Sequence, residues 1–520
     1  MTMQGEIERQ DLLRPKPESA RGRSLVLGAL AAALFAALWL AANAGLYNLD
    51  QLHVKFMYVD QAGYILSARI LAATGELKNG VVFPAQIDSP DFYVHMPGHV
   101  VALATSYALF GWGIAQTLLP SVVGYVLGAV LVFLVGNRLY SLRAGLIATL
   151  LFCAFPANVA YSFTAMAELT FTCACIAAIA AFVHLPPRLL AWGPPLLLVL
   201  PFLFRESAAF LILPMAWCIV RVQGWRGAAL ASAGSVASLW AVNRWQIASG
   251  KVAASLAWVT EGSFNYGDAF AEAPEPLAAG EWLPALWKNV VLNLRHLEGH
   301  VSTFPGELMP WALYGALGIA TLAFGLGLPR RRVDPFAFGA GVLMVFVVLL
   351  AVTVYDAKAH KLLRTLMYTV PFGAIAVAGQ LAPPAGTGSR IGWKPGATAT
   401  LLVLVLAAGF QVSRLAAKTM TRQDALTLRN TQELARMHGS GMIVAGNLAA
   451  PLAVEGHPDV TWCLAPENEE TLALVLERYD VRTIVAFKPL TEEFTREHRL
   501  RKTHRQRIGL RWHTFYRPLP

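Results

Sequence analysis

Long apolar runs separated by short polar and charged stretches dominate the first four fifths of the chain. A run of about 20 apolar residues can cross the hydrocarbon core of a bilayer as a helix. The pattern therefore predicts a mostly α-helical, polytopic membrane protein with about eleven transmembrane helices. We place these helices at about 24–46, 114–136, 144–161, 168–184, 189–204, 207–220, 227–246, 307–328, 335–355, 365–381 and 397–413.

One apolar stretch, from Val100 to Phe110, is shorter than the others. It is too short to cross a bilayer comfortably, so we expect an interfacial or re-entrant helix. Counting it as a span would place Arg138 and Arg143 outside, although Lys and Arg accumulate in cytoplasmic loops.

The same orientation rule sorts the loops. Several arginines precede the first span, and Arg330-Arg331-Arg332 marks an inner loop. The long polar segments at about 47–99 and 248–305 then lie outside, and an odd number of spans places the C-terminal region outside as well. We therefore expect a protein of the bacterial inner membrane with a cytoplasmic N-terminus and a periplasmic or extracellular C-terminal region.

The region from residue 414 to 520 differs in character from the first 413 residues, because its charge rises and its apolar runs shorten. Asp424–Met437 and Asn468–Tyr479 have the pattern of helices, and Met442–Ala445 and Arg482–Phe487 that of strands. This α-β-α-β order predicts a small α/β domain with a short parallel sheet, joined to a transmembrane domain formed by residues 1–413.

Composition supports a membrane protein. Of 520 residues, 56% are hydrophobic and 14% are charged, whereas a soluble domain has about 25% charged residues. The net charge of +10 is explained by basic inner loops, so we expect no nucleic-acid partner. The five cysteines show neither a disulfide framework nor the spacing of a zinc site.

Candidate chemistry gathers on the predicted outer side. Asp60 precedes an amphipathic helix in which Tyr64, Ala68 and Leu71 share one face. An acid at that position can stabilise the helix start by about 1 kcal/mol, or it can act as a general base. Ionisable residues near membrane depth are costly and favour a functional role. The other candidates on this side are Arg69, His95, His99, Glu168, Arg205, Glu206, Lys358, His360, Lys361 and Arg364.

Two of these groups have alternative interpretations. The cationic loop from Lys358 to Arg364 violates the orientation rule unless it meets an anion such as a lipid phosphate; otherwise the loop is cytoplasmic. Glu168 either orients the acceptor or Arg205, or only stabilises the start of a helix. His95 and His99 are separated by Pro97, so they are not expected to form a helical metal-binding pair.

Several of these segments resemble the GT-C glycosyltransferases, among them the protein O-mannosyltransferases and the lipid A aminoarabinose transferases. The resemblance covers roughly residues 30–380. The family has two adjacent acidic residues where this sequence has Asp60-Gln61, so the second acid is replaced by glutamine here. The matching segments are Asp60 with Tyr64 and Arg69, Met96-Pro97-Gly98-His99, Leu109-Phe110-Gly111, Asn137–Tyr140 with Arg143–Gly145, Glu168, Phe204-Arg205-Glu206, and Arg364–Tyr368 with Pro371.

The resemblance implies transfer of a sugar from a polyprenyl-phosphate carrier to an acceptor hydroxyl at the outer membrane face, with inversion. Asp60 would be the base, Glu168 a second acid, and Arg205, Lys361 and Arg364 would stabilise the phosphate. The remaining candidates would bind substrate. The acceptor could be a lipid, a glycan or a protein, and a divalent metal is possible. A polysaccharide polymerase or ligase, or a lipid or solute transporter, is the alternative.

Overall fold

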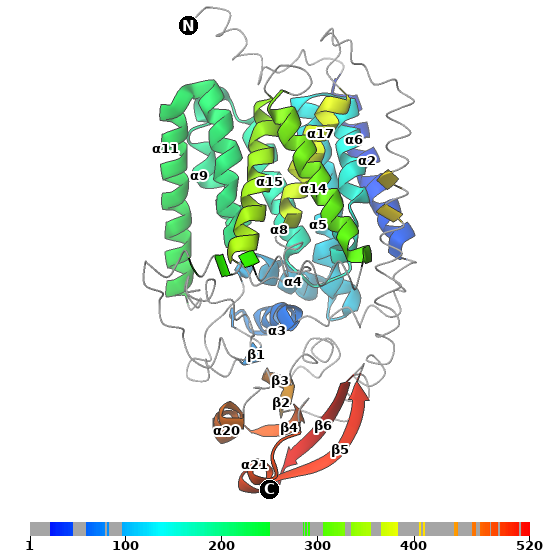
Figure 1. The fold of residues 1–520 in the computed structure, drawn as a ribbon, viewed down its shortest axis with the longest axis vertical. Helices are drawn as coiled ribbons and strands as arrows, with labels where there is room; N and C mark the ends of the chain where they lie inside the picture. Colours follow the sequence, from blue (N-terminus) through cyan, green and yellow to red (C-terminus); the bar gives the residue numbers. More distant parts are fainter. Residues whose placement is uncertain are drawn as a thin grey trace, which may run out of the picture.

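The structure is a computed structural model of the whole chain. It describes residues 21–44, 59–78, 81–82, 96–249, 305–327, 334–354, 366–382, 441–445, 460–463, 469–478, 480–486, 489–508 and 511–519, with single positions near 284–291 and 405–410. A bundle of apolar helices forms most of this part, and a mixed sheet lies beyond one end of the bundle (Figure 1).

The helices of the bundle follow the predicted apolar runs. They are α2 (Arg21–Ala44), α5 (Ile114–Leu139), α6 (Leu142–Ala154), α7 (Pro156–Ser162), α8 (Glu168–His184), α9 (Gly193–Leu197), α10 (Val199–Phe202), α11 (Ile212–Ala248), α14 (Pro305–Gly325), α15 (Pro335–Val354) and α17 (Val370–Leu381). Short 3₁₀ segments, η4 (Pro187–Leu189), η5 (Glu206–Leu211) and η6 (Met367–Thr369), connect some of them.

Proline and glycine explain where predicted spans are broken. The predicted span at 144–161 is two helices bent by 64°, and Pro156 begins the second because proline suits a first helical turn. Pro194 and Pro195 stand at the start of α9 in the same way and interrupt the predicted span at 189–204. Gly224, with φ of 77°, separates the two halves of α11 and thereby divides the predicted spans at 207–220 and 227–246.

Among the described residues, three helices are long and apolar enough to cross a membrane, or four if the bent pair is one span. They are accompanied by shorter apolar helices, including α8 and α17. These helices support an integral membrane protein. The total of about eleven spans stays a prediction, because the last predicted span, 397–413, lies almost wholly outside the described residues.

Helix α5 is central and packs against α2, α6 and α8. Its contact with α6 depends on small residues: a Cβ at Gly136 would lie 2.9 Å from Gly145 Cα. Ser141 caps α6 by accepting a hydrogen bond from the Ala144 N–H. The motif from Asn137 to Gly145 therefore has a structural function, since it forms a tight turn between two closely packed helices.

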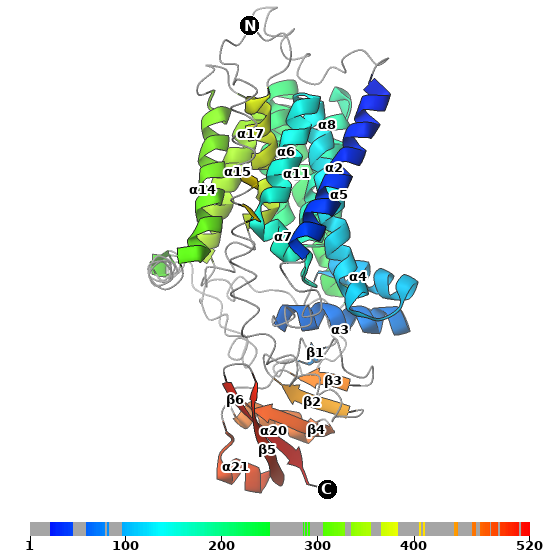
Figure 2. The same ribbon diagram turned by 90° about the vertical axis from the view of Figure 1, so that its right-hand side faces the viewer.

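Two helices lie across the end of the bundle rather than within it. They are α3 (Val59–Thr74) and α4 (Pro97–Phe110), and α4 lies between α3 and α5 (Figure 2). The expectation of an interfacial rather than a spanning helix at 100–110 agrees with this placement. Tyr64 and Ala68 of α3 are buried against α4, as the shared face predicted.

The sheet has the strand order β1-β3-β2-β4-β6-β5. Strands β1 (Val81–Val82), β3 (Val460–Cys463), β2 (Gly441–Ala445) and β4 (Val481–Ala486) are parallel. Strand β6 (Arg511–Pro518) pairs antiparallel with β4 and with β5 (Leu500–Ile508). Helices α20 (Glu469–Arg478) and α21 (Glu492–Glu497) complete this part.

The parallel pairing of β2 with β4, and helix α20 between them in sequence, agree with the predicted pattern. Strands β3, β5 and β6 and helix α21 were not predicted. The predicted helix Asp424–Met437 lies outside the described residues, and the domain boundary at residue 413 stays a prediction. Val81 of the first long loop pairs with Trp462 of the C-terminal region. These two regions, both predicted to lie outside, are therefore at the same end of the bundle.

Candidate functional site

The candidate site lies at the end of the bundle that faces the sheet, where α3, α4 and the start of α8 meet (Figure 2). The sequence placed Asp60 directly before this helix; in the structure it is the second residue of α3 and lies in the first turn. The segment between α7 and α8 and the chain before η5 approach the same region. Four segments that are distant in sequence therefore contribute to it.

Gln61 fixes the start of α3 to the segment before α8. Its side chain is fully buried, and its Oε1 accepts a hydrogen bond from the Ala165 N–H at 3.0 Å. Ala165 lies three residues before Glu168. The backbone of Asp60 is thus held close to the start of α8.

Glu168 and Arg205 form an ion pair in which the glutamate is buried and the arginine is partly exposed. Arg205 Nη2 donates to Glu168 Oε1 at 2.6 Å, with side-chain exposures of 23% and 1%, respectively. Burying a charge is costly unless an opposite charge and hydrogen bonds compensate. Glu168 is almost completely buried, so its Oε1 holds the Arg205 guanidinium at this position. Glu168 is also the first residue of α8, where the helix dipole favours an anion.

A close contact at Gly98 positions the chain that carries Arg205. The Gly98 N–H donates to the Leu203 carbonyl at 2.8 Å. A Cβ at this position would lie 2.8 Å from Phe204 Cδ2 and 2.9 Å from the Leu203 oxygen. Glycine is therefore required for this approach. The resemblance at Met96-Pro97-Gly98-His99 thus marks the point where α4 contacts the Arg205 turn.

His99 joins α3, α4 and α8 in one network. The ring is fully buried, and it meets the edge of Tyr64 at a centroid distance of 5.0 Å. His99 Nε2 is 3.0 Å from the Ala165 carbonyl, and Nδ1 is 2.9 Å from Thr170 Oγ1. Because a carbonyl only accepts, Nε2 must carry a proton.

The partner of Nδ1 can adapt to the charge of the ring. The Thr170 hydroxyl is also 2.9 Å from the Ala167 carbonyl. It can donate to Nδ1 of a neutral His99, or donate to Ala167 and accept from an imidazolium. These contacts are those of a positioning residue, since His99 holds both ends of the segment that leads into α8.

Arg69 lies farther along α3 and has a different environment. Its guanidinium is 4.0 Å from the ring centroid of Trp112, a cation–π contact. Nine residues at about 1.5 Å each separate it from Asp60 along the helix axis. Arg69 is therefore placed to fasten α3 to the α4–α5 turn.

Tyr107 stabilises that turn. Its hydroxyl lies 3.0 Å from Thr117 Oγ1, and Thr117 in turn donates to the Gly113 carbonyl at 2.8 Å. Burial raises the pKa of the Tyr107 hydroxyl well above its usual value, so the group stays neutral and donates to Thr117.

The other predicted residues divide into two groups. Glu206 follows Arg205 and is exposed. His95, Lys358, His360, Lys361 and Arg364 lie outside the described residues. Two residues after Arg364, the described chain resumes at Leu366, and Tyr368 is buried with its ring 5.0 Å from that of Phe171 on α8.

Sequence reasoning missed the contacts that Gln61 and Thr170 make in this region. Gln61 was noted only as a departure from an acidic pair. Its signal was a polar residue on the apolar face of α3, next to Asp60. Thr170 gave no signal, because threonine is common in apolar helices.

Among the residues that the structure describes, no group of three or more His, Cys, Asp or Glu side chains could hold a metal ion. Gln61, in the place of the family's second acid, uses its oxygen to accept from Ala165. The divalent metal that the resemblance allows therefore stays a prediction.

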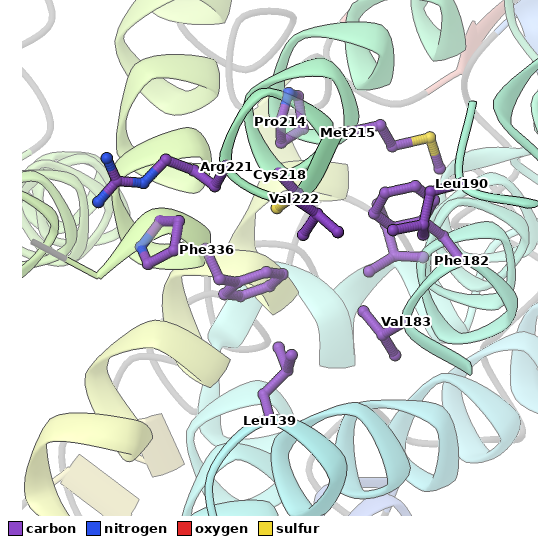
Figure 3. A pocket seen from close by; sticks show the side chains of 12 residues that line it. Leu139, Phe182, Val183, Leu190, Pro214, Met215, Cys218, Arg221, Val222 and Phe336 are labelled. Atoms are coloured by element: carbon purple, nitrogen blue, oxygen red, sulfur yellow. The ribbon is translucent and has the colours of Figure 1, made fainter. Parts of the chain in front are cut away.

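An apolar pocket lies away from this site, toward the opposite end of α8. It is lined by Phe182, Val183, Val222 and Phe336 among others, and the guanidinium of Arg221 extends away from its centre (Figure 3). The pocket contains no predicted site residue, so its lining does not resemble a centre for transfer chemistry.

Comparisons with known proteins support the fold of the chain. No protein-family model matches the chain, and no curated protein sequence does. ArnT from Cupriavidus metallidurans in the apo state is similar in structure, with a TM-score of 0.51, 12% identity, and coverage of 93% of this chain and 98% of that one. The same protein bound to undecaprenyl phosphate gives a TM-score of 0.49 and 13% identity over 92% and 98% of the two chains.

A second similar structure is the Archaeoglobus fulgidus oligosaccharyltransferase in complex with zinc and sulfate. Its TM-score is 0.51, with 11% identity and coverage of 87% of this chain and 67% of that one. Both proteins are GT-C glycosyltransferases, which confirms the predicted resemblance at the level of fold. The chain is therefore an integral membrane protein with the GT-C fold.

Proposed function

We propose that the protein transfers a sugar from a polyprenyl-phosphate carrier to an acceptor hydroxyl. The observation that supports this proposal is that the start of α3, where Asp60 lies in the chain, is held to the segment before α8, at whose first residue Glu168 pairs with Arg205. The Gln61–Ala165 hydrogen bond and the Glu168–Arg205 ion pair bring their segments together. The fold, the acid and the cation held by Glu168 are the three elements that such a reaction needs.

Asp60 acts as the general base in this proposal. A carboxylate near neutral pH is ionised and can accept the proton of an acceptor hydroxyl. The hydroxyl oxygen attacks the anomeric carbon, the bond between that carbon and the phosphate oxygen breaks, and polyprenyl phosphate leaves. A single displacement inverts the anomeric centre.

Arg205 stabilises the phosphate as its charge develops. A guanidinium suits this task because its forked donors match phosphate oxygens. Its contact with Glu168 fixes the side chain in advance, so less reorganisation is needed during the reaction. We propose Lys361 and Arg364 as further phosphate contacts, with Tyr64, Arg69, His95, His99, Glu206, Lys358 and His360 supporting the substrates.

The donor and the orientation belong to the same proposal. ArnT from Cupriavidus metallidurans is known bound to undecaprenyl phosphate, and the GT-C resemblance in the sequence implies a donor of that class. We propose eleven spans, a cytoplasmic N-terminus, and a site facing the outside together with the sheet. The acceptor is a lipid, a glycan or a protein.

A transfer assay tests the proposal. Purified protein in lipid nanodiscs is given a panel of polyprenyl-phosphate sugars and acceptors, and release of polyprenyl phosphate is measured. Asp60→Asn should lower the rate by about 10²- to 10⁴-fold while binding of polyprenyl phosphate persists. Glu76→Gln is the matched control, since Glu76 lies just after α3, is 59% exposed and pairs with Lys78. Equal rates for Asp60→Asn and the control would exclude Asp60 as the base, and no transfer from any donor would refute the function.

A further inference from the structure

The chain between α7 and α8 is buried although it is not helical. Every residue from Phe163 to Ala167 is buried. Buried backbone N–H and C=O groups need partners, and an irregular segment cannot supply all of them from within itself. Gln61 of α3 and His99 of α4 meet part of this need by bonding the N–H and the carbonyl of Ala165. The carbonyls on either side of Ala165 need a partner from elsewhere.

Ser121 of α5 is that partner. Its side chain is fully buried, and its Oγ lies 2.7 Å from the Thr164 oxygen and 3.3 Å from the Met166 oxygen. The single hydroxyl proton is thus directed at the two carbonyls that flank Ala165, with the shorter contact to Thr164. A serine within a helix commonly bonds a carbonyl of its own helix, whereas Ser121 bonds a separate segment. Helices α3, α4 and α5 therefore each contribute a side chain that holds this segment.

The part of α5 next to this serine is itself fixed to its neighbours. Pro120 lies inside the helix and has no N–H, so the Gln116 carbonyl one turn earlier loses its partner within α5. Ser106 of α4 donates to that carbonyl at 2.7 Å. Toward α8, a Cβ at Gly124 would lie 3.0 Å from the Leu169 oxygen, so the two helices are in direct backbone contact. This part of α5 is therefore a fixed support for the segment and for the start of α8.

The segment leads directly into the candidate site. Glu168 follows Ala167 in the chain and holds Arg205 at 2.6 Å, so a shift of the segment would also shift the guanidinium relative to the start of α3. We propose that Ser121 is a positioning residue for the transfer reaction, which holds the Glu168–Arg205 pair in place from α5. This inference rests on the proposed function. Ser121 acts through Glu168 and Arg205 rather than on the substrates.

The variant Ser121→Ala of the full chain, in lipid nanodiscs, tests the inference. It leaves the Thr164 and Met166 carbonyls without the serine hydroxyl, so Arg205 is held less precisely. We expect kcat for transfer to fall by about 10- to 100-fold, because small displacements within a site have effects of this size. KM for the donor should change by less than about threefold, since the lost contact serves the transition state. Amide hydrogen exchange of residues 163–167 should become faster, and this measurement does not require transfer.

Ser235→Ala is the matched control. Ser235 of α11 is also fully buried, but its hydroxyl donates to the Ala231 carbonyl of its own helix at 2.7 Å. Both variants lose one buried hydroxyl that bonds a backbone carbonyl, so a general loss of stability would affect them alike. We expect Ser235→Ala to keep the native kcat and the native exchange of residues 163–167. A double variant shows the route: when Glu168→Gln is already present, adding Ser121→Ala should lower kcat by less than about threefold.

Three results would overturn the inference while leaving the proposed function in place. They are equal kcat values for Ser121→Ala and Ser235→Ala, equal hydrogen exchange of residues 163–167 in these two variants, and a full further loss of kcat when Ser121→Ala is added to Glu168→Gln. In the last case Ser121 would not act through Glu168. Absence of transfer by the native chain would instead refute the proposed function, and the inference together with it.

Discussion

The two ends of α8 differ in the burial and the hydrogen-bond partners of their polar groups. At the start of the helix, Glu168 and Thr170 are buried and have specific partners on other segments. At its end, His184 is exposed and its Nδ1 lies 2.7 Å from the Ala180 carbonyl of the same helix, and the nearby pocket is apolar. Burying polar groups costs free energy unless they are paired. Within α8, this cost is therefore met at the start of the helix, where a function is proposed, and avoided at its end.

The largest difference in stability between the two ends is expected when an arginine is removed from each. Arg205→Ala leaves the Glu168 carboxylate, 1% exposed, without its ion-pair partner, so we expect a loss of about 3 kcal/mol in the free energy of unfolding. Arg221→Ala removes an exposed cation at the edge of the pocket and should change it by less than about 0.5 kcal/mol. Unfolding in mixed micelles measures both.

Adding Glu168→Gln to the first variant should recover part of the loss, because the buried group is then neutral. Equal destabilisation by Arg205→Ala and Arg221→Ala would show that the Glu168–Arg205 pair is not a special feature of the site end.

Histidines provide an intermediate test. His99→Leu leaves the Ala165 carbonyl and the Thr170 hydroxyl without their ring partner, so we expect a loss of about 2 kcal/mol. His184→Leu removes only a contact within its own helix and should cost less than about 0.5 kcal/mol. The same unfolding measurement compares the two, and a larger effect at His184 would contradict the network at His99.

The sequence predicted the helices and motifs that depend on a local pattern of residues. Apolar runs predicted α5, α8, α14 and α15 closely, because burial in a bilayer requires about 20 apolar residues. Motif resemblance selected Arg205 and His99 for the candidate site. It also predicted the GT-C fold that the structural similarity confirms.

Other features depend on contacts between distant segments, which a single sequence does not contain. The Glu168–Arg205 pair was only one of several roles weighed for Glu168. The Gln61–Ala165 bond was not foreseen, because a backbone N–H has no sequence signature. The β5–β6 hairpin was missed because its many basic residues hide the alternation by which strands are recognised.

The smallest effect should come from adding volume at the two ends. Val222 lines the apolar pocket, so Val222→Leu has room for its extra methylene. The bilayer is as apolar as the pocket, so filling the pocket adds little stability, and we expect the free energy of unfolding to change by less than about 0.5 kcal/mol.

Ala68 on α3 is fully buried against α4, so Ala68→Val overpacks that contact and should lower the free energy of unfolding by about 1 kcal/mol. Because Ala68 lies on the helix that carries Asp60, its variant should also slow transfer, whereas Val222→Leu should not. A slower rate of transfer in Val222→Leu would show that the two ends of the bundle are coupled. The pocket could then no longer be contrasted with the candidate site as a region without a role in transfer.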